Sequence, residues 1–342
     1  MTEQVDMNGA DAISVIGMQK TFGSVVALEN IDLAVPKGSV MGLLGPNGAG
    51  KTTFVRILTT LLSLDSGEAF VAGYNVARNP SAVRSVIGLA GQYAAVDENL
   101  TGQENLEMVG RLYHLKGAES KRRAADLLER FDLTDAANRR AKAFSGGMRR
   151  RLDLAASLLA QPQVLFLDEP TTGLDPRGRI GMWDVISELV NDGTTVLLTT
   201  QYLEEADYLA DTITVLDEGR IIAQGTSDQL KSQIGGEVLE VRVADRSQAH
   251  VAAEAIAQLG AGAPQVTEEV GVIALPVTGG ASVLAEAVRR LDAAGLTISD
   301  LAIRQPTLDD VFLSLTGHTA ESGDASKDSI ESRTRRRTRR VR

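Results

Sequence analysis

The sequence predicts an α/β fold with a parallel sheet covered by helices, followed by a smaller α+β unit, and three observations support this. Strand-like and helix-like segments alternate through the first two thirds of the chain. Two strand-like runs, at 163–170 and 194–200, are largely apolar, as expected for a sheet covered on both faces. The pattern changes near residues 232–237, beyond which a run of alternating polarity at 237–245 begins a second series of extended and helical segments. A length of 342 residues favours about two domains.

The elements of the main unit are expected in a simple order. An apolar strand at 39–45 leads into a Gly-rich turn and then a helix at 52–62, where apolar residues recur at helical spacing. Another strand is expected at 85–92. Two amphipathic helices, at 101–115 and 119–133, then interrupt the alternating pattern and indicate an inserted helical subdomain.

The last third of the chain resembles a small α+β unit of ferredoxin-like type. We therefore expect a first domain at 1–235, with its helical subdomain at about 93–155, a second at 236–317, and a tail at 318–342. The segments of the second domain are strands at 237–245, 271–277 and 296–305 and helices at 247–260, 281–295 and 307–317.

Composition argues against several kinds of site and segment. The chain has no cysteine, which excludes disulfides and thiolate metal sites, and its three histidines are too far apart in sequence to suggest a zinc centre. The N-terminus lacks the apolar run of a secretory signal. No run approaches the roughly 20 apolar residues of a membrane span. If the protein works at a membrane, we expect another chain to cross it.

Charge is distributed unevenly along the chain. The net charge is −10, although residues 333–342 read RTRRRTRRVR after a polar stretch that is expected to be disordered. The acidic remainder argues against nucleic-acid binding. Two interpretations of the tail stay open: a solvated arm without a partner, or attraction to anionic lipid at roughly 1 kcal/mol per Arg.

The stretch GPNGAGKTT matches the Walker A pattern G-x-x-x-x-G-K-[ST] and lies between a predicted strand and helix. Its glycines allow backbone N–H groups to surround phosphate oxygens, Lys51 adds a positive charge for the β and γ phosphates, and Thr52 offers a hydroxyl to Mg²⁺. The pattern predicts ATP binding. The binding residues are Gly45, Pro46, Asn47, Gly48, Ala49, Gly50, Lys51, Thr52 and Thr53.

The stretch VLFLDEP predicts a strand that ends in two carboxylates. Asp168 is expected to hold magnesium, directly or through water, and Glu169 to polarise an attacking water. The alternative is that the pair only caps the strand end. The Lys51 loop in the same chain favours the catalytic interpretation.

The stretch FSGGMRRRLDLAASLLAQP places a Ser-Gly-Gly turn at the start of a helix, which forms a second anion-binding helix end. With this motif shortly before VLFLDEP, the chain over residues 14–233 resembles the ATP-binding subunit of an ATP-binding cassette (ABC) transporter. The resemblance implies a P-loop NTPase with a RecA-like core and a head-to-tail dimer. Ser145 and Gly147, with Gly146 between them, would then reach the γ phosphate in the partner chain.

The resemblance implies roles for three further residues. Phe22 aligns with the aromatic residue that stacks on adenine, although a phenylalanine in the core is the alternative. Gln92 matches the glutamine that touches magnesium and the attacking water, at the junction with the helical subdomain where family members contact the membrane subunit. Asp175, in TTGLD, would face the partner's site.

Gln201 departs from the family pattern, which usually has histidine at this position. A glutamine amide can donate a hydrogen bond to a phosphate oxygen, but it cannot carry a proton or a positive charge. We therefore expect weaker, though retained, stabilisation of the transition state. The stretch TTQYLEEAD resembles the daunorubicin/doxorubicin-resistance branch of ABC exporter ATPases, in which glutamine occupies this place.

The stretch RQPTLDDVFLSLTG, at 304–317, resembles the closing motif of the same branch. Its apolar stripe is expected to pack against its own domain and to support docking or dimer formation, not to bind a drug. The stripe consists of Leu308, Val311, Phe312 and Leu315.

These features predict a peripheral ATPase on the cytoplasmic face of the membrane. A dimer of this chain, with a separate permease, would export a hydrophobic drug-like compound or lipid. One alternative is an ABC ATPase that acts on nucleic acid or ribosomes; such relatives tend to have two cassettes or a long coiled-coil insertion, which this chain lacks. Another alternative is a nucleotide switch that does not hydrolyse ATP.

Overall fold

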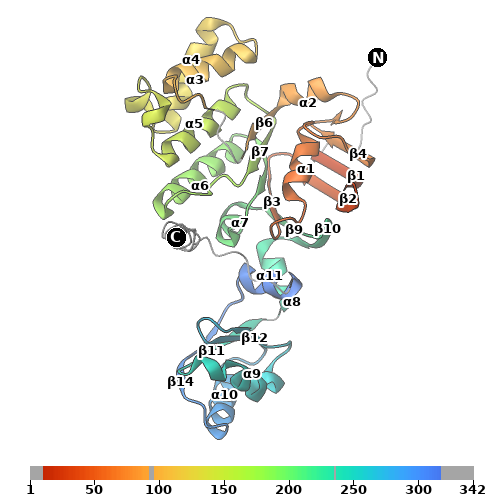
Figure 1. The fold of residues 1–342 in the computed structure, drawn as a ribbon, viewed down its shortest axis with the longest axis vertical. Coiled ribbons are helices and arrows are strands. Elements are labelled where there is room, and N and C mark those ends of the chain that lie inside the picture. Colours follow the sequence, from red (N-terminus) through yellow and green to blue (C-terminus); the bar gives the residue numbers. More distant parts are fainter. Residues whose placement is uncertain (1–10, 92–95, 235, 317–342) are drawn as a thin grey trace, which may run out of the picture.

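The computed structural model describes residues 11–91, 96–234 and 236–316. Figure 1 shows an elongated molecule with a large domain at one end and a small α+β unit at the other. Helices α8 (Ser227–Ile234) and α11 (Leu308–Thr316) lie between them. Within the described part of the chain, no helix combines the length and apolar character needed to cross a membrane.

The central sheet of the large domain has six strands in the order β10-β9-β3-β8-β7-β6. All neighbouring pairs are parallel except β10 with β9, so the predicted parallel sheet is confirmed. The strands are β3 (Val40–Leu44), β6 (Ile87–Ala90), β7 (Val164–Asp168), β8 (Thr195–Thr199), β9 (Thr212–Asp217) and β10 (Arg220–Gly225).

Apolar strands of this sheet are buried on both faces because successive side chains point to opposite sides. In β7, Val164 and Phe166 belong to the core around α1 (Lys51–Leu58), whereas Leu165 and Leu167 belong to a second core that includes α5 and α6. The helices that follow in chain order are α3 (Gly102–Leu112), α4 (Gly117–Arg130), α5 (Gly146–Leu158), α6 (Pro176–Asn191) and α7 (Leu203–Leu209).

A second sheet of the large domain, in the order β2-β1-β4-β5, covers the first core. The sequence motifs assigned no elements to this sheet; β1 pairs with β2 and β4 with β5 as local antiparallel pairs, and only the pairing of β1 with β4 joins distant segments. The prediction of a strand at 85–92 is partly wrong, because helix α2 (Pro80–Val86) includes its first two residues. The strands of the second sheet are β1 (Asp11–Phe22), β2 (Val25–Pro36), β4 (Ser66–Val71) and β5 (Tyr74–Asn75).

The small unit contains an antiparallel sheet in the order β12-β13-β11-β14. A short strand that the sequence did not reveal, β12, completes a β-α-β-β-α-β chain order, so the ferredoxin-like prediction is confirmed. The elements are β11 (Glu237–Val243), α9 (Ala249–Ile256), β12 (Gln265–Thr267), β13 (Val272–Val277), α10 (Ala281–Ala293) and β14 (Ile298–Arg304).

Helix α11 packs against the large domain, so the expectation that its apolar stripe packs within its own domain is wrong. Spacing shows that the stripe is buried but not which surface covers it. Leu315, the last member of the stripe, is 38% exposed. The buried cluster contains Leu308, Val311 and Phe312 of α11, Leu203 and Ala206 of α7, and Leu230 of α8.

Candidate active site

Three adjacent parallel strands bring the predicted site residues to one edge of the central sheet. Thr199 of β8 pairs with Leu43 of β3 on one side and with Asp168 of β7 on the other, so the three strands end at the same level. The carboxyl ends of parallel strands are the usual location of ligand sites in α/β folds. Gln92, predicted beyond the end of the neighbouring strand β6, lies outside the described residues.

The phosphate-binding loop at 45–53 depends on glycine at two close approaches. A Cβ added to Gly45 would lie 2.1 Å from the Leu216 carbonyl oxygen, and one added to Gly50 would lie 2.5 Å from the Ala27 carbonyl oxygen. The φ of Gly50 is 108°, a conformation that disfavours residues with a Cβ. Helix α1 begins directly after Gly50, so the loop presents the positive end of that helix.

Lys51, the first residue of α1, is buried at the inner side of the loop. Its Nζ donates to the carbonyl oxygens of Gly45 at 2.6 Å and Pro46 at 3.0 Å, which holds the ammonium against the loop backbone. Thr52 is exposed and Thr53 half-buried. The lysine is therefore positioned by the loop itself, close to the backbone that would surround phosphate.

Asp168 closes strand β7 and is held by the neighbouring strand. The Thr199 hydroxyl donates to Asp168 Oδ1 at 2.6 Å, and Asp168 is only 9% exposed. A buried carboxylate with one fixed hydrogen bond keeps acceptor capacity on its other oxygen. This environment suits a ligand to a cation or to its water shell.

Glu169 adopts a left-handed backbone conformation, with φ of 53°. Its N–H donates to the Thr199 carbonyl oxygen at 3.0 Å and to the Thr199 hydroxyl at 3.2 Å, while its Oε2 accepts from the Thr172 hydroxyl at 3.2 Å. Such strain in a residue with a side chain is frequent at functional sites. Sequence reasoning missed the role of Thr199, although its signal is a polar residue ending an otherwise apolar strand.

Gln201 follows the end of β8 at the same sheet edge and is half-buried. Helix α7 starts just beyond it and contains Glu205, which is fully buried and accepts a hydrogen bond from Trp183 Nε1 at 3.1 Å. Burial raises the pKa of Glu205 above its ordinary value, although hydrogen bonds act against this. Gln201 therefore lies just before a helix that the hydrogen bond between Glu205 and Trp183 connects to α6.

The Ser-Gly-Gly turn and the TTGLD turn that ends in Asp175 each lead into a helix of the large domain. The Ser145 hydroxyl accepts from the Met148 N–H at 3.2 Å and caps α5, and Asp175 Oδ1 accepts from the Gly178 N–H at 2.7 Å and caps α6. Both turns line one pocket of about 700 Å³. Its described lining, which also includes Gly146, Gly147 and three arginines, contains no residue of the 45–53 loop.

Phe22 is 48% exposed at the end of β1, which excludes the alternative of a core phenylalanine. Lys20 Nζ lies 5.4 Å from the centre of its ring. The hairpin continues into β2, where Ala27 and Leu28 approach Gly50 of the phosphate-binding loop. An exposed aromatic ring on this hairpin is available for stacking.

A phosphate-binding loop and a carboxylate pair at one sheet edge define the class of P-loop nucleotide hydrolases. A family model described as ABC transporter matches residues 28–172. The chain is 55% identical over 316 residues to the daunorubicin resistance ATP-binding protein DrrA2 of Streptomyces coeruleorubidus, covering 92% of this chain and 98% of that protein. The chain therefore belongs to the ATP-binding proteins of the ABC transporter family, and it is an ATPase.

Other comparisons agree with this assignment. The chain is 48% identical to the daunorubicin/doxorubicin resistance protein DrrA of Streptomyces peucetius, over 91% of this chain and 94% of that one. A solved ATP-binding subunit of an ABC transporter matches with a TM-score of 0.60 and 29% identity, over 65% of this chain and 92% of that one. The predicted resemblance to the daunorubicin/doxorubicin-resistance branch is confirmed.

Proposed function

We propose that the chain powers an exporter that moves a hydrophobic, drug-like compound through a separate permease. The main support is that similarity to a protein named for daunorubicin resistance covers both the large domain and the small unit, across 98% of that protein. A further relative, 34% identical, is named for linearmycin resistance. Because ABC exporters act from the side that holds ATP, the proposed location is the cytoplasmic face of the membrane.

The proposed residue roles in hydrolysis are supported by the register of β3, β8 and β7, which end at the same level of the sheet. Lys51 binds the β and γ phosphates, Glu169 orients and polarises the attacking water, and Gln201 donates its amide to the γ phosphate. Thr52 and Asp168, which supply the oxygen donors that Mg²⁺ prefers, would hold that ion, with Gln92 as a third contact. When bound, Mg²⁺ neutralises phosphate charge.

Two copies of the chain would complete each site. The pocket lined by Ser145, Gly147 and Asp175 is separate from the 45–53 loop, so head-to-tail pairing would place it over the partner's phosphates. A solved dimeric ATP-binding cassette bound to ADP and phosphate is 25% identical, with a TM-score of 0.58, over 63% of this chain and 98% of that one. Phe22 would stack on the adenine of its own chain's nucleotide.

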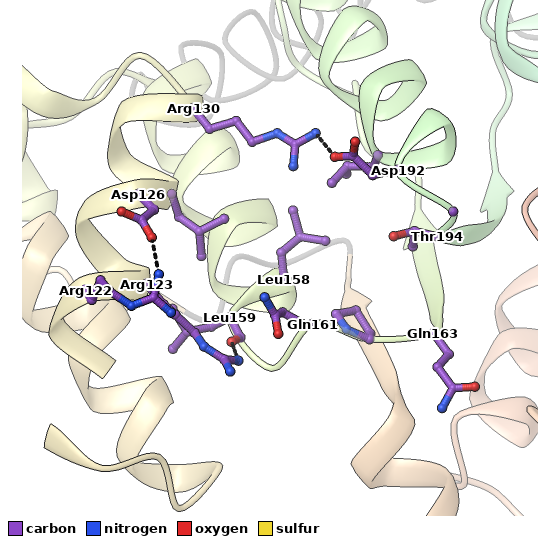
Figure 2. A pocket seen from close by; sticks show the side chains of 14 residues that line it. Arg122, Arg123, Asp126, Arg130, Leu158, Leu159, Gln161, Gln163, Asp192 and Thr194 are labelled. Atoms are coloured by element: carbon purple, nitrogen blue, oxygen red, sulfur yellow. Dashed lines mark hydrogen bonds and ion pairs between the residues drawn. The ribbon is translucent and has the colours of Figure 1, made fainter. Parts of the chain in front are cut away.

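A groove between α4 and the central core is the proposed dock for a cytoplasmic segment of the permease. Its volume is about 490 Å³, and in Figure 2 Arg130 of α4 reaches Asp192 across it, while Arg123 lies beside Leu159, just after α5. A groove lined by both leucines and charged side chains suits an amphipathic segment. A segment bound there would contact the helical subdomain and the core together. The apolar lining residues include Leu127, Leu158, Leu159 and Leu189, and the charged lining residues are Arg122, Arg123, Asp126, Arg130 and Asp192.

The hydrolytic part of the proposal is tested by magnesium-dependent ATP turnover of the purified chain beside Gln201→His and Gln201→Ala. We expect wild type to turn over, and Gln201→Ala to be slower by about 10- to 100-fold, since a hydrogen bond to a charged group, worth about 1.5–3 kcal/mol, is lost. If wild type binds ATP but stays idle until Gln201→His restores turnover, the chain is a nucleotide switch and the proposal is wrong.

The transport part is tested by co-expression with the permease and daunorubicin uptake into inverted membrane vesicles. We expect ATP-dependent uptake and co-purification of the two chains. The double variant Arg122→Glu, Arg123→Glu should lose co-purification while ATP binding is kept. Arg78→Glu is the matched control, since Arg78 is an exposed arginine that pairs with Glu68 and does not line the groove. Co-purification with ribosomes in place of a membrane protein would contradict the proposal.

The Arg-rich tail at 333–342 lies outside the described residues. Contact of this segment with anionic lipid is proposed from its charge alone, at roughly 1 kcal/mol per arginine near the surface. Binding of the full chain and of a chain ending at residue 332 to phosphatidylserine vesicles tests this contact. Equal binding by the two would contradict it.

A further inference from the structure

Arg150 is a buried arginine that joins three parts of the large domain. It lies on α5, the helix that Ser145 caps, and it is only 9% exposed. Its Nε donates to the Pro170 carbonyl oxygen at 2.8 Å, and its Nη2 donates to the carbonyl oxygens of Asp168 at 3.0 Å and Glu169 at 2.8 Å. Its Nη1 donates to the Gly91 carbonyl oxygen, at the end of β6.

The two neighbouring arginines have different partners. Arg149 pairs with Glu98 at 2.8 Å on the surface, and Arg151 donates to the Phe131 carbonyl oxygen at 3.1 Å. In this run of three arginines, Arg150 is the residue with hydrogen bonds to the end of the catalytic strand β7. Its five N–H donors form a rigid planar fork, which an ammonium group cannot reproduce.

The charge of Arg150 is retained although it is buried. Burial lowers the pKa of the guanidinium, while Asp153, Asp168 and Glu205 nearby act in the opposite direction. Asp153 Oδ2 lies 3.6 Å from Nη1. An arginine that stays protonated makes charge-assisted hydrogen bonds, which are stronger than neutral ones.

We infer that Arg150 is a positioning residue for ATP hydrolysis, which holds the strained backbone of Glu169 and connects it to the Ser145-capped helix. This inference rests on the proposed role of Glu169 as the group that polarises water. Ser145 caps the start of α5, and Arg150, on the same helix, donates to the Glu169 carbonyl oxygen. A displacement of α5 therefore moves the Glu169 carbonyl and, with it, the Glu169 carboxylate. Binding of a partner nucleotide at Ser145 is thereby linked to the position of Glu169 in the same chain.

The experiment compares Arg150→Lys and Arg150→Gln with wild type in the full-length purified chain. Turnover, KM for ATP, affinity for a fluorescent ATP analogue and thermal unfolding are measured together. We expect kcat to fall by about 10- to 100-fold, with KM and affinity within about 3-fold, because misplacement of a catalytic group affects chemistry more than binding. Arg139→Lys is the matched control, since Arg139 also donates to a backbone carbonyl oxygen in the helical subdomain.

A double variant separates this inference from the proposed function on which it rests. If Arg150 acts through Glu169, adding Arg150→Lys to Glu169→Gln causes little further loss, as measured with radiolabelled ATP. If Glu169→Gln alone leaves turnover intact, the proposed role of Glu169 fails. If Glu169→Gln abolishes turnover but Arg150→Lys does not slow it, only the present inference is overturned. Parallel loss of ATP binding and of cooperative unfolding in both Arg150 variants would also overturn it, since a purely structural arginine behaves in that way.

Discussion

The carboxyl edge of the central sheet and the contact of α11 with the large domain are stabilised in different ways. At the sheet edge, Lys51, Arg150 and Asp168 are buried charged groups whose hydrogen bonds go mainly to backbone carbonyls and to Thr199. The α11 contact is an apolar cluster that includes Phe312, with an ion pair of Arg304 and Asp310 beside it. Hydrogen bonds therefore hold charged side chains in defined positions at the sheet edge, as the proposed chemistry requires, whereas α11 contributes buried apolar surface to the fold.

The largest effect is expected at Lys51. Lys51→Ala removes the charge held against the phosphate-binding loop, so ATP turnover should fall by at least about 100-fold. The midpoint of thermal unfolding should change little, because the substitution removes hydrogen bonds to the carbonyl oxygens of Gly45 and Pro46 but no member of the apolar cores. A coupled phosphate-release assay and calorimetry measure the two quantities. A variant that unfolds but keeps its turnover per folded molecule would contradict the view that Lys51 serves phosphate binding and not stability.

Phe312→Ala should have the opposite profile. Phe312 is 4% exposed in the cluster that joins α11 to α7 and α8, and truncation of a buried phenylalanine costs about 3–5 kcal/mol of the free energy of unfolding. Leu315→Ala on the same helix is the control, since Leu315 is 38% exposed and should lose less than about 1 kcal/mol. Urea denaturation measures both, and equal losses would contradict the packing of α11.

Asp310→Asn should destabilise the chain by about 1–2 kcal/mol at neutral pH. Burial raises the pKa of Asp310, but hydrogen bonds from Arg304 and Thr307 outweigh it and leave the pKa below its usual range. A lowered pKa in the folded state adds stability above the unfolded value, about 3.9, and this stability is lost as the pH falls through the folded pKa. Wild type and variant should therefore converge in acid. A constant difference from pH 7 to pH 3 would show that the charge is not the cause.

The smallest effect is expected for Glu205→Gln, within about 1 kcal/mol. Burial raises the pKa of Glu205 in the folded state. Between the unfolded pKa and the higher folded pKa, the folded state therefore binds more protons than the unfolded state, and the free energy of unfolding falls as the pH rises through that range. Glutamine keeps the acceptor for Trp183 Nε1 without the charge. The variant should therefore gain relative to wild type as the pH rises from the unfolded pKa, about 4.3, to neutrality. Denaturant titrations at the two ends of this range measure the gain, and a relative loss would contradict the buried environment.

The sequence predicted those parts of the site that depend on local spacing. The 45–53 loop follows from its glycines and from Lys51, and the carboxylate pair follows from an apolar strand that ends in Asp168 and Glu169. Contacts between distant segments could not be predicted in this way. Periodicity shows that α11 has a buried face but not that α7 and α8 cover it. Similarly, Arg150 lies between two other arginines, and only the rotation of α5 on the core decides which of them is buried.

The most direct test of this division is Glu169→Gln, compared with wild type for ATP turnover at saturating ATP and for thermal unfolding. The change keeps the size of the side chain and an acceptor for the Thr172 hydroxyl, but removes the carboxylate proposed to polarise water. We predict loss of turnover by at least about 100-fold, with ATP binding and the unfolding midpoint retained. Turnover close to that of wild type would contradict the assignment of the chemistry to this sheet edge.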